Sequence, residues 1–293
     1  MEKSAPTMQH LPILCAAVLF GALLLCGCLG GGDGTATPVP TPVLPEGSAT
    51  PAATAATPPT PTPALLTSAA MADRSPNWAG YAVQTSFDAP ASDVVDAVEA
   101  TWNVPPVDCA GTNGNDYASA FWVGIDGISS NSVEQIGTES DCIGGAPAYY
   151  AWYEVFPQDS VTLDLAISPG DEVHAKVEYV SNNQFKYTIT DLTTDQTVSF
   201  TNRARVTADR SSAEWVAEAP TNGRNRLLPL AQFGPVVFTN ASVTVNGKTG
   251  PISSAGWQYE PIIMESRGGS LKATPSALGA GGTGFTVVWQ NPL

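Results

Sequence analysis

Three polar side chains could do chemistry because each lies in an apolar stretch, in strand phase with a tryptophan or a small residue. Glu154 follows Trp152 by two positions, Gln135 precedes Gly137 by two, and Glu218 ends a similar alternating run. Side chains two residues apart project from the same face of a β-strand. Carboxylates can move protons, and a primary amide can donate and accept hydrogen bonds. The alternative for each one alone is an edge-strand residue that faces solvent.

Residues 121–127 show the same pattern, because Phe, Val and Ile alternate there with Trp122, a glycine and Asp126. This alternation has the period of a β-strand. One face is apolar, and the other carries an indole, a gap and a carboxylate, like the floor of a groove. An ordinary sandwich strand that ends at an Asp-Gly turn is the alternative. Together with the three segments above, the pattern predicts a concave face lined by tryptophan and acidic residues.

The scarcity of histidine excludes most other hydrolytic sites. Outside the first 28 residues the only histidine is His174, which lies in the middle of an alternating run, whereas a catalytic triad needs its histidine aligned with a nucleophile. The sequence contains no Gly-x-Ser-x-Gly elbow, phosphate-binding loop or dinucleotide fingerprint. It also has too few histidines and cysteines for a zinc site. We therefore expect no metal and no cofactor, and any catalysis must come from carboxylates and amides.

The elements that position these residues belong to the third of three regions. Residues 1–28 have the pattern of an export signal, whose apolar stretch at 11–25 is short for a membrane span. It ends in Leu25-Cys26-Gly27-Cys28, which resembles a lipobox, so Cys28 is the expected lipidation site; a plain secretory signal and an uncleaved anchor are the alternatives. Residues 29–70, rich in Thr, Pro and Ala, predict a disordered linker. Residues 71–293 predict one extracellular domain, held at the membrane by the lipid.

The domain has the pattern of an all-β protein, because its apolar runs are short, alternating and separated by turns. The simplest architecture is an antiparallel two-sheet β-sandwich. Strands are expected at 161–167, 172–179, 185–190, 197–201, 235–239, 242–245 and 285–289.

Cysteine and charge limit the covalent links and the partners. Cys109 and Cys142 are the only cysteines of the domain and predict one disulfide in an oxidising compartment, with two free thiols as the alternative. The net charge of −15 argues against nucleic acid as a partner. Asn240 begins a glycosylation sequon whose use stays open. We expect a monomer.

The ordered set of motifs resembles the eqolisins, or glutamic peptidases, over most of residues 75–260. The matching motifs are, in chain order, Asn77-Trp78-Ala79-Gly80, the Phe-Trp-Val-Gly-Ile-Asp-Gly run at 121–127, Gln135-Ile136-Gly137, Ala151-Trp152-Tyr153-Glu154 and Ala213-Glu214-Trp215-Val216-Ala217-Glu218. The resemblance implies a concanavalin-like sandwich of two bent sheets with a concave cleft, and an acid endopeptidase that acts on proteins and peptides.

The resemblance also implies roles for individual residues. Gln135 and Glu218 fall on the catalytic pair, and the residues that line or support the cleft are Trp78, Trp122, Asp126, Trp152 and Glu154. The sequence departs from the family pattern in two places: Ala219-Pro220 follows Glu218, and Tyr150 stands where an aspartate is usual. A carbohydrate- or peptide-binding β-sandwich module is the competing class. That alternative explains the tryptophans but not the pair of Gln135 and Glu218.

Overall fold

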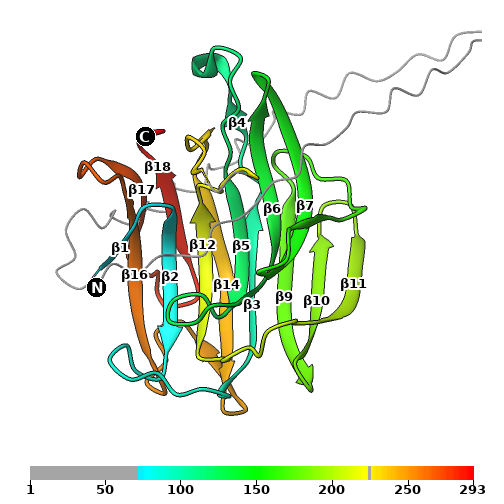
Figure 1. Ribbon diagram of the computed structural model, residues 1–293, viewed down its shortest axis with the longest axis vertical. Coiled ribbons are helices and arrows are strands. Elements are labelled where there is room, and N and C mark those ends of the chain that lie inside the picture. The colour runs from blue at the N-terminus through cyan, green and yellow to red at the C-terminus, as the bar shows by residue number, and fades with distance from the viewer. Residues whose placement is uncertain (1–71, 224–225) are drawn as a thin grey trace, which may run out of the picture. The chain divides into compact units, whose positions relative to one another are not determined.

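The computed structural model describes residues 72–223 and 226–293, which form β-strands and one short 3-10 helix (Figure 1). The elements are β1 (Asp73–Ser75), β2 (Trp78–Gln84), β3 (Val95–Asn103), β4 (Val107–Asp108), η1 (Ala110–Thr112), β5 (Ala120–Ile125), β6 (Val133–Ile143), β7 (Ala146–Phe156), β8 (Val161–Thr162), β9 (Glu172–Ser181), β10 (Gln184–Asp191), β11 (Gln196–Arg203), β12 (Ser212–Glu218), β13 (Gln232–Phe233), β14 (Val236–Val245), β15 (Lys248–Pro251), β16 (Gln258–Glu265), β17 (Leu271–Pro275) and β18 (Phe285–Trp289). In this part of the chain no helix is long and apolar enough to cross a membrane. The predicted signal, Cys28 and the linker lie outside the described residues.

Most strands belong to one large antiparallel sheet. Its order is β11-β10-β9-β3-β14-β18-β17-β16-β2-β12-β5-β6-β7-β8, with β15 added beside β14 and β1 added in parallel beside β16. Strands β5, β6 and β12 also pack against β3, β9 and β10, with which they share no ladder. The all-β antiparallel prediction is confirmed, and the concanavalin-like two-sheet arrangement stays a prediction.

The burial of the strands follows from their sequences. Strand β9 alternates, with Val173, Ala175 and Val177 buried among the core residues and the side chains between them partly exposed. Strands β5 and β12 are buried along their whole length, as expected for strands covered on both faces. Polar residues on these two strands are therefore buried.

Two strand predictions need correction. The expected strand at 161–167 is reduced to β8, because the chain leaves the sheet after Thr162 while Leu165 and Ile167 still bury their side chains in the core. The alternating apolar residues after Thr162 therefore pack in the core without pairing with a neighbouring strand. The two strands expected at 235–239 and 242–245 are one strand, β14, with an irregularity at Asn240, whose φ is 52°.

The predicted disulfide is present: Cys109 bonds to Cys142 with a Cα–Cα distance of 5.6 Å, and ties the residue before η1 to the end of β6. The bond closes a loop of 33 residues, for which chain entropy gives about 3–4 kcal/mol of stabilisation.

The double variant Cys109→Ser/Cys142→Ser is expected to have a Tm about 10 °C below that of the native chain. Thermal unfolding followed by circular dichroism at pH 4 checks this. The native chain scanned with reductant is the control and should move in the same direction. An unchanged Tm in both samples would contradict the assignment of a stabilising bond.

Candidate active site

All predicted site residues except Asp126 project from one face of five neighbouring strands. Residues paired across an antiparallel ladder lie on the same face, so the register defines rows of side chains that run across β7, β6, β5, β12 and β2. The three central rows are Glu154–Gln135–Gly124–Glu214–Ala82, Trp152–Gly137–Trp122–Val216–Gly80 and Tyr150–Glu139–Ala120–Glu218–Trp78. We call these three rows the tryptophan face.

The carboxyl of Glu218 is buried, and each of its oxygens accepts one hydrogen bond. Asn77 Nδ2 donates to Oε1 at 2.9 Å, and Trp122 Nε1 donates to Oε2 at 2.8 Å. Burial raises the pKa of Glu218 to about 8. The N–H groups of Trp122, Trp78 and Asn77 oppose this rise, because they favour the ionised carboxylate. Trp78 Nε1 lowers the pKa of Glu218 although it forms no hydrogen bond within the described residues. The group is thus a buried acid whose ionised form has two fixed donors.

Gln135 lies on the same face and is held by the other predicted carboxyl. Its Nε2 donates to Glu154 Oε2 at 2.5 Å, while its Oε1 is buried and has no partner in the described part of the chain. Burial raises the pKa of Glu154 well above its usual value, and the nearby charge of Glu218 raises it further. An amide oxygen and the second amide N–H therefore remain available for a ligand.

Trp122 fills the space between Gln135 and Glu218. A Cβ on Gly124 would lie 2.9 Å from the ring of Trp122 and 3.1 Å from Gln135 Cβ, and a Cβ on Gly137 would lie 2.6 Å from Trp122 Cβ. A Cβ on Gly137 would also lie 2.2 Å from the backbone oxygen of Phe121, so there the backbone as well as Trp122 requires glycine. The register places Gln135 and Glu218 two strands and four residues apart, with this ring between them. The side chains of the two residues form no direct hydrogen bond in the described structure.

The other two tryptophans complete an apolar layer. Trp78 meets Trp122 edge to face, with 5.0 Å between ring centroids, and both belong to a buried cluster with Trp152. Edge-to-face geometry is favoured by the charge distribution of aromatic rings. The structure thus brings together all three tryptophans that the sequence singled out.

Asp126 has a different place from the others. Its carboxylate accepts hydrogen bonds from the backbone N–H groups of Arg210 at 2.7 Å and Ser211 at 2.8 Å, directly before β12 begins. Burial raises its pKa, and these hydrogen bonds oppose the change. Asp126 therefore supports the strand that carries Glu218 and does not extend the rows of the tryptophan face.

Sequence reasoning gave no role to several polar residues that the structure adds. Glu139 and Glu214 are buried on the tryptophan face, and burial raises the pKa of both well above the usual value. Tyr150 donates its hydroxyl to Asp141 Oδ2 at 2.9 Å, and burial raises the pKa of Asp141 to about 6. The signal was available in β6, where Gln135, Glu139 and Asp141 share one strand phase.

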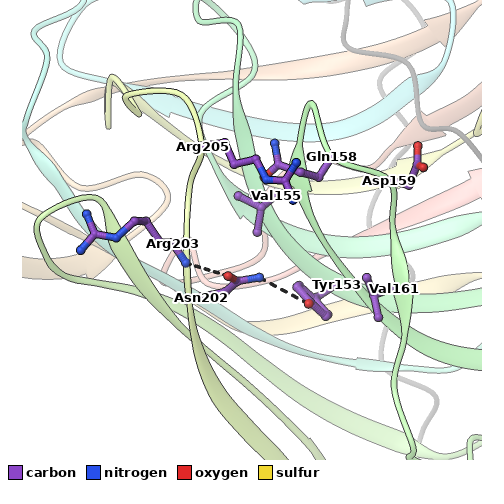
Figure 2. A pocket seen from close by; sticks show the side chains of 8 residues that line it. All are labelled: Tyr153, Val155, Gln158, Asp159, Val161, Asn202, Arg203 and Arg205. Atoms are coloured by element: carbon purple, nitrogen blue, oxygen red, sulfur yellow. Dashed lines mark hydrogen bonds between the residues drawn. The ribbon is translucent and has the colours of Figure 1, made fainter.

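A cavity of about 290 Å³ is lined by residues between Tyr153 and Val161 and by residues between Asn202 and Arg205 (Figure 2). Its walls include Tyr153 and Val155, whose side chains point opposite to the tryptophan face. Figure 2 shows Arg205 beside Gln158, whereas the guanidinium group of Arg203 points away. The cavity is therefore separate from the site of the predicted residues.

The chain has relatives among known proteins. The sequence matches the Peptidase A4 family over residues 76–282. Aspergillopepsin-2 of Aspergillus niger is 36% identical over 138 residues, which span 46% of this chain and 49% of that protein. The chain thus aligns with about half the length of this relative. Scytalidopepsin B of Scytalidium lignicola is 32% identical over 200 residues, or 65% of this chain and 71% of that protein.

Solved structures give the same result. Scytalido-glutamic peptidase, crystallised with a transition-state analogue inhibitor, has a TM-score of 0.59 at 29% identity and covers 73% of this chain and 98% of its own. Aspergilloglutamic peptidase from Aspergillus niger has a TM-score of 0.53 at 32% identity, with 59% and 99% covered. On the family match and these likenesses, the chain belongs to the Peptidase A4 family, the glutamic peptidases or eqolisins.

Proposed function

We propose that the chain is an acid endopeptidase in which Glu218 and Gln135 form the catalytic pair, at the concave cleft of the two-sheet sandwich that the family resemblance implies. The observation that carries the proposal is a buried carboxyl fixed by two donors, on the same face as an amide whose oxygen has no partner among residues 72–223 and 226–293. Trp78, Trp122 and Trp152, which are buried, line or support the cleft from beneath. Glu154 and Asp126 act as supports.

The reaction needs one group that both takes and returns a proton. With a pKa of about 8, Glu218 is mostly protonated at acid pH. Its ionised fraction removes a proton from water, and the water oxygen attacks the carbon of the scissile carbonyl. The free N–H of Gln135 donates to the oxyanion, and its Oε1 orients the water. Protonated Glu218 then gives the proton to the leaving nitrogen as the C–N bond breaks. The products are a carboxylic acid and an amine, and Glu218 is ionised again.

Glutamine suits this partnership because it cannot titrate. A second carboxylate beside Glu218 would add a like charge and favour protonation of one group. In this chain Glu154 holds the amide of Gln135, and burial raises the pKa of Glu154, which favours its neutral form. The proton-transfer group is thus separated from the group that stabilises the oxyanion.

Cleavage of an acid-denatured protein by the purified mature chain at pH 3 to 6 tests the proposal. Pepstatin is expected to inhibit poorly, because it mimics the transition state of enzymes with an aspartate pair. A binding module would retain the substrate without producing fragments, and the tryptophans alone would support that outcome. Release of new peptide ends decides between the two functions.

The proposal includes secretion as a monomer and anchorage through Cys28, which lies outside the described residues. Cys28→Ser is expected to release the protein into the medium or to leave an uncleaved precursor. Membrane fractionation and the mass of the mature N-terminus check this. Correct processing with unchanged membrane retention would contradict the lipid anchor.

A further inference from the structure

Residues 75–78 form a turn that holds the carboxyl of Glu218 from the N-terminal side of the domain. Ser75 Oγ accepts hydrogen bonds from the backbone N–H of Asn77 at 3.3 Å and of Trp78 at 3.0 Å. Its hydroxyl donates to Asn77 Oδ1 at 3.2 Å. Because Oδ1 receives this hydroxyl, the amide nitrogen of Asn77 is turned toward Glu218, where it donates to Oε1 at 2.9 Å. One arrangement of the amide satisfies both partners.

The main chain of the same turn is fixed at two further points. The backbone N–H of Ala219 donates to Asn77 O at 2.8 Å, so the residue after Glu218 is joined to the turn. Lys272 Nζ donates to Pro76 O at 3.2 Å from a side chain that is 2% exposed. Burial lowers the pKa of Lys272 to about 8, so at acid pH the donor is an ammonium group. Charge-assisted hydrogen bonds are stronger than neutral ones.

We propose that Asn77 is a positioning residue for the reaction, which fixes the orientation of the Glu218 carboxyl and favours its ionised form, and that Ser75 and Lys272 hold Asn77 in place. The inference rests on the proposed function of Glu218. Trp122 donates to Oε2 and Asn77 donates to Oε1, so the two bonds together fix the rotation of the carboxyl and leave a lone pair on each oxygen. A carboxyl without Asn77 keeps one donor and can rotate about its last bond.

The protonation of Glu218 depends on the groups that surround its carboxyl. Trp78 from β2 and Trp122 from β5 are neutral donors. Glu139 from β6 and Glu154 from β7 are carboxyls whose pKa values are raised by burial and also by the charge of Glu218. Removing the Asn77 donor therefore leaves ionised Glu218 with one hydrogen bond and acidic neighbours, which favours protonation.

The test measures the titration of Glu218 directly. In the mature chain labelled with ¹³C at glutamate Cδ, the signal that disappears in Glu218→Gln belongs to Glu218. Asn77→Ala is expected to move the midpoint of that signal upward by about one pH unit, and to lower kcat about tenfold with little change in KM, since one hydrogen bond to a charged group is lost. Asn77→Asp, which carries a donor when protonated, is expected to recover part of kcat at low pH.

Asn103→Ala is the matched control. Asn103 also bridges two strands, through Nδ2 to Pro235 O and Oδ1 from Val237 N, and its loss is expected to lower stability without moving the Glu218 midpoint. If Asn77→Ala does not fold, Ser75→Ala, which frees the amide to turn, carries the same test with a smaller shift.

An unchanged midpoint and kcat in folded Asn77→Ala would overturn the inference while leaving the role of Glu218 intact. Full activity of Glu218→Gln would instead overturn the proposed function, and the midpoint shift caused by Asn77→Ala would still be observed.

Discussion

Glu218→Gln is expected to abolish peptide hydrolysis while the protein remains folded. Glutamine has nearly the same shape as glutamate, and its amide oxygen can still accept a hydrogen bond from Asn77 or from Trp122, although its nitrogen cannot accept the other one. It can neither take a proton from water nor return one to the leaving nitrogen. Loss of a group that both accepts and donates the proton should lower kcat by at least about 10³-fold, because general acid–base catalysis contributes about 10²–10⁴-fold.

Release of acid-soluble peptides from denatured protein at pH 4 measures this effect.

Gln135→Ala is expected to lower kcat on the order of 10²-fold, the usual cost of losing an oxyanion donor. Glu154→Gln is expected to have a milder effect, because an amide can still accept from Gln135 Nε2. Glu172→Gln, on the exposed face of β9, is the control and should behave like the native chain. A folded Glu218→Gln protein that still cleaves the substrate would falsify the mechanism.

Stability is expected to fall steeply as the pH rises from about 4 to about 8. Burial raises the pKa of seven carboxyls, among them Asp141 to about 6 and Glu218 to about 8, and the others are Asp126, Glu134, Glu139, Glu154 and Glu214. In this pH window the native state binds more protons than the unfolded state, so each rise in pH favours unfolding. The stabilisation that the protonated buried carboxyls provide is complete at a pH below the ordinary carboxyl pKa. It is lost as the pH rises through the raised pKa values of the native state.

The Tm is expected to drop by about 10 °C or more between pH 4 and pH 8, since tenfold changes in several acid constants correspond to several times 1.4 kcal/mol. Thermal unfolding at fixed ionic strength measures it. Glu214→Gln, which removes one buried acid from the tryptophan face, should flatten the dependence and raise the Tm at pH 8. Glu172→Gln should leave the slope unchanged. Equal slopes in all three proteins would assign the effect to general charge repulsion.

The alternation of residues along each strand was enough to predict which site residues share a face. Gln135, Glu154 and Glu218 were predicted to share a face with tryptophans, and the register places them in adjoining rows of the tryptophan face. Alternation succeeds here because side-chain direction in a strand is local. Their roles in catalysis stay predictions.

The alternation of residues could not predict contacts between segments that are distant in the sequence. Asp126 was placed beside the groove by its phase, but its partners are backbone N–H groups of residues 210 and 211, more than 80 positions away. Asn77 stood in a quoted motif without a role, because its bond to Glu218 joins residues 141 positions apart. The run at 161–167 had the alternation of a strand, but its ladder with β7 ends at Thr162 while Leu165 and Ile167 bury their side chains in the core.

Strand β1 also has a mechanical meaning. It comprises three residues, pairs in parallel with β16 alone, and ends two residues before Asn77. If the protein is tethered through its N-terminus, tension from the tether enters the domain through this short pairing and then reaches the turn that holds Glu218. The Arg74–Glu265 ion pair and the Lys272 bond to Pro76 resist that load beside the turn. A pull that detaches β1 would therefore loosen the proton-transfer group before it disturbed the large sheet.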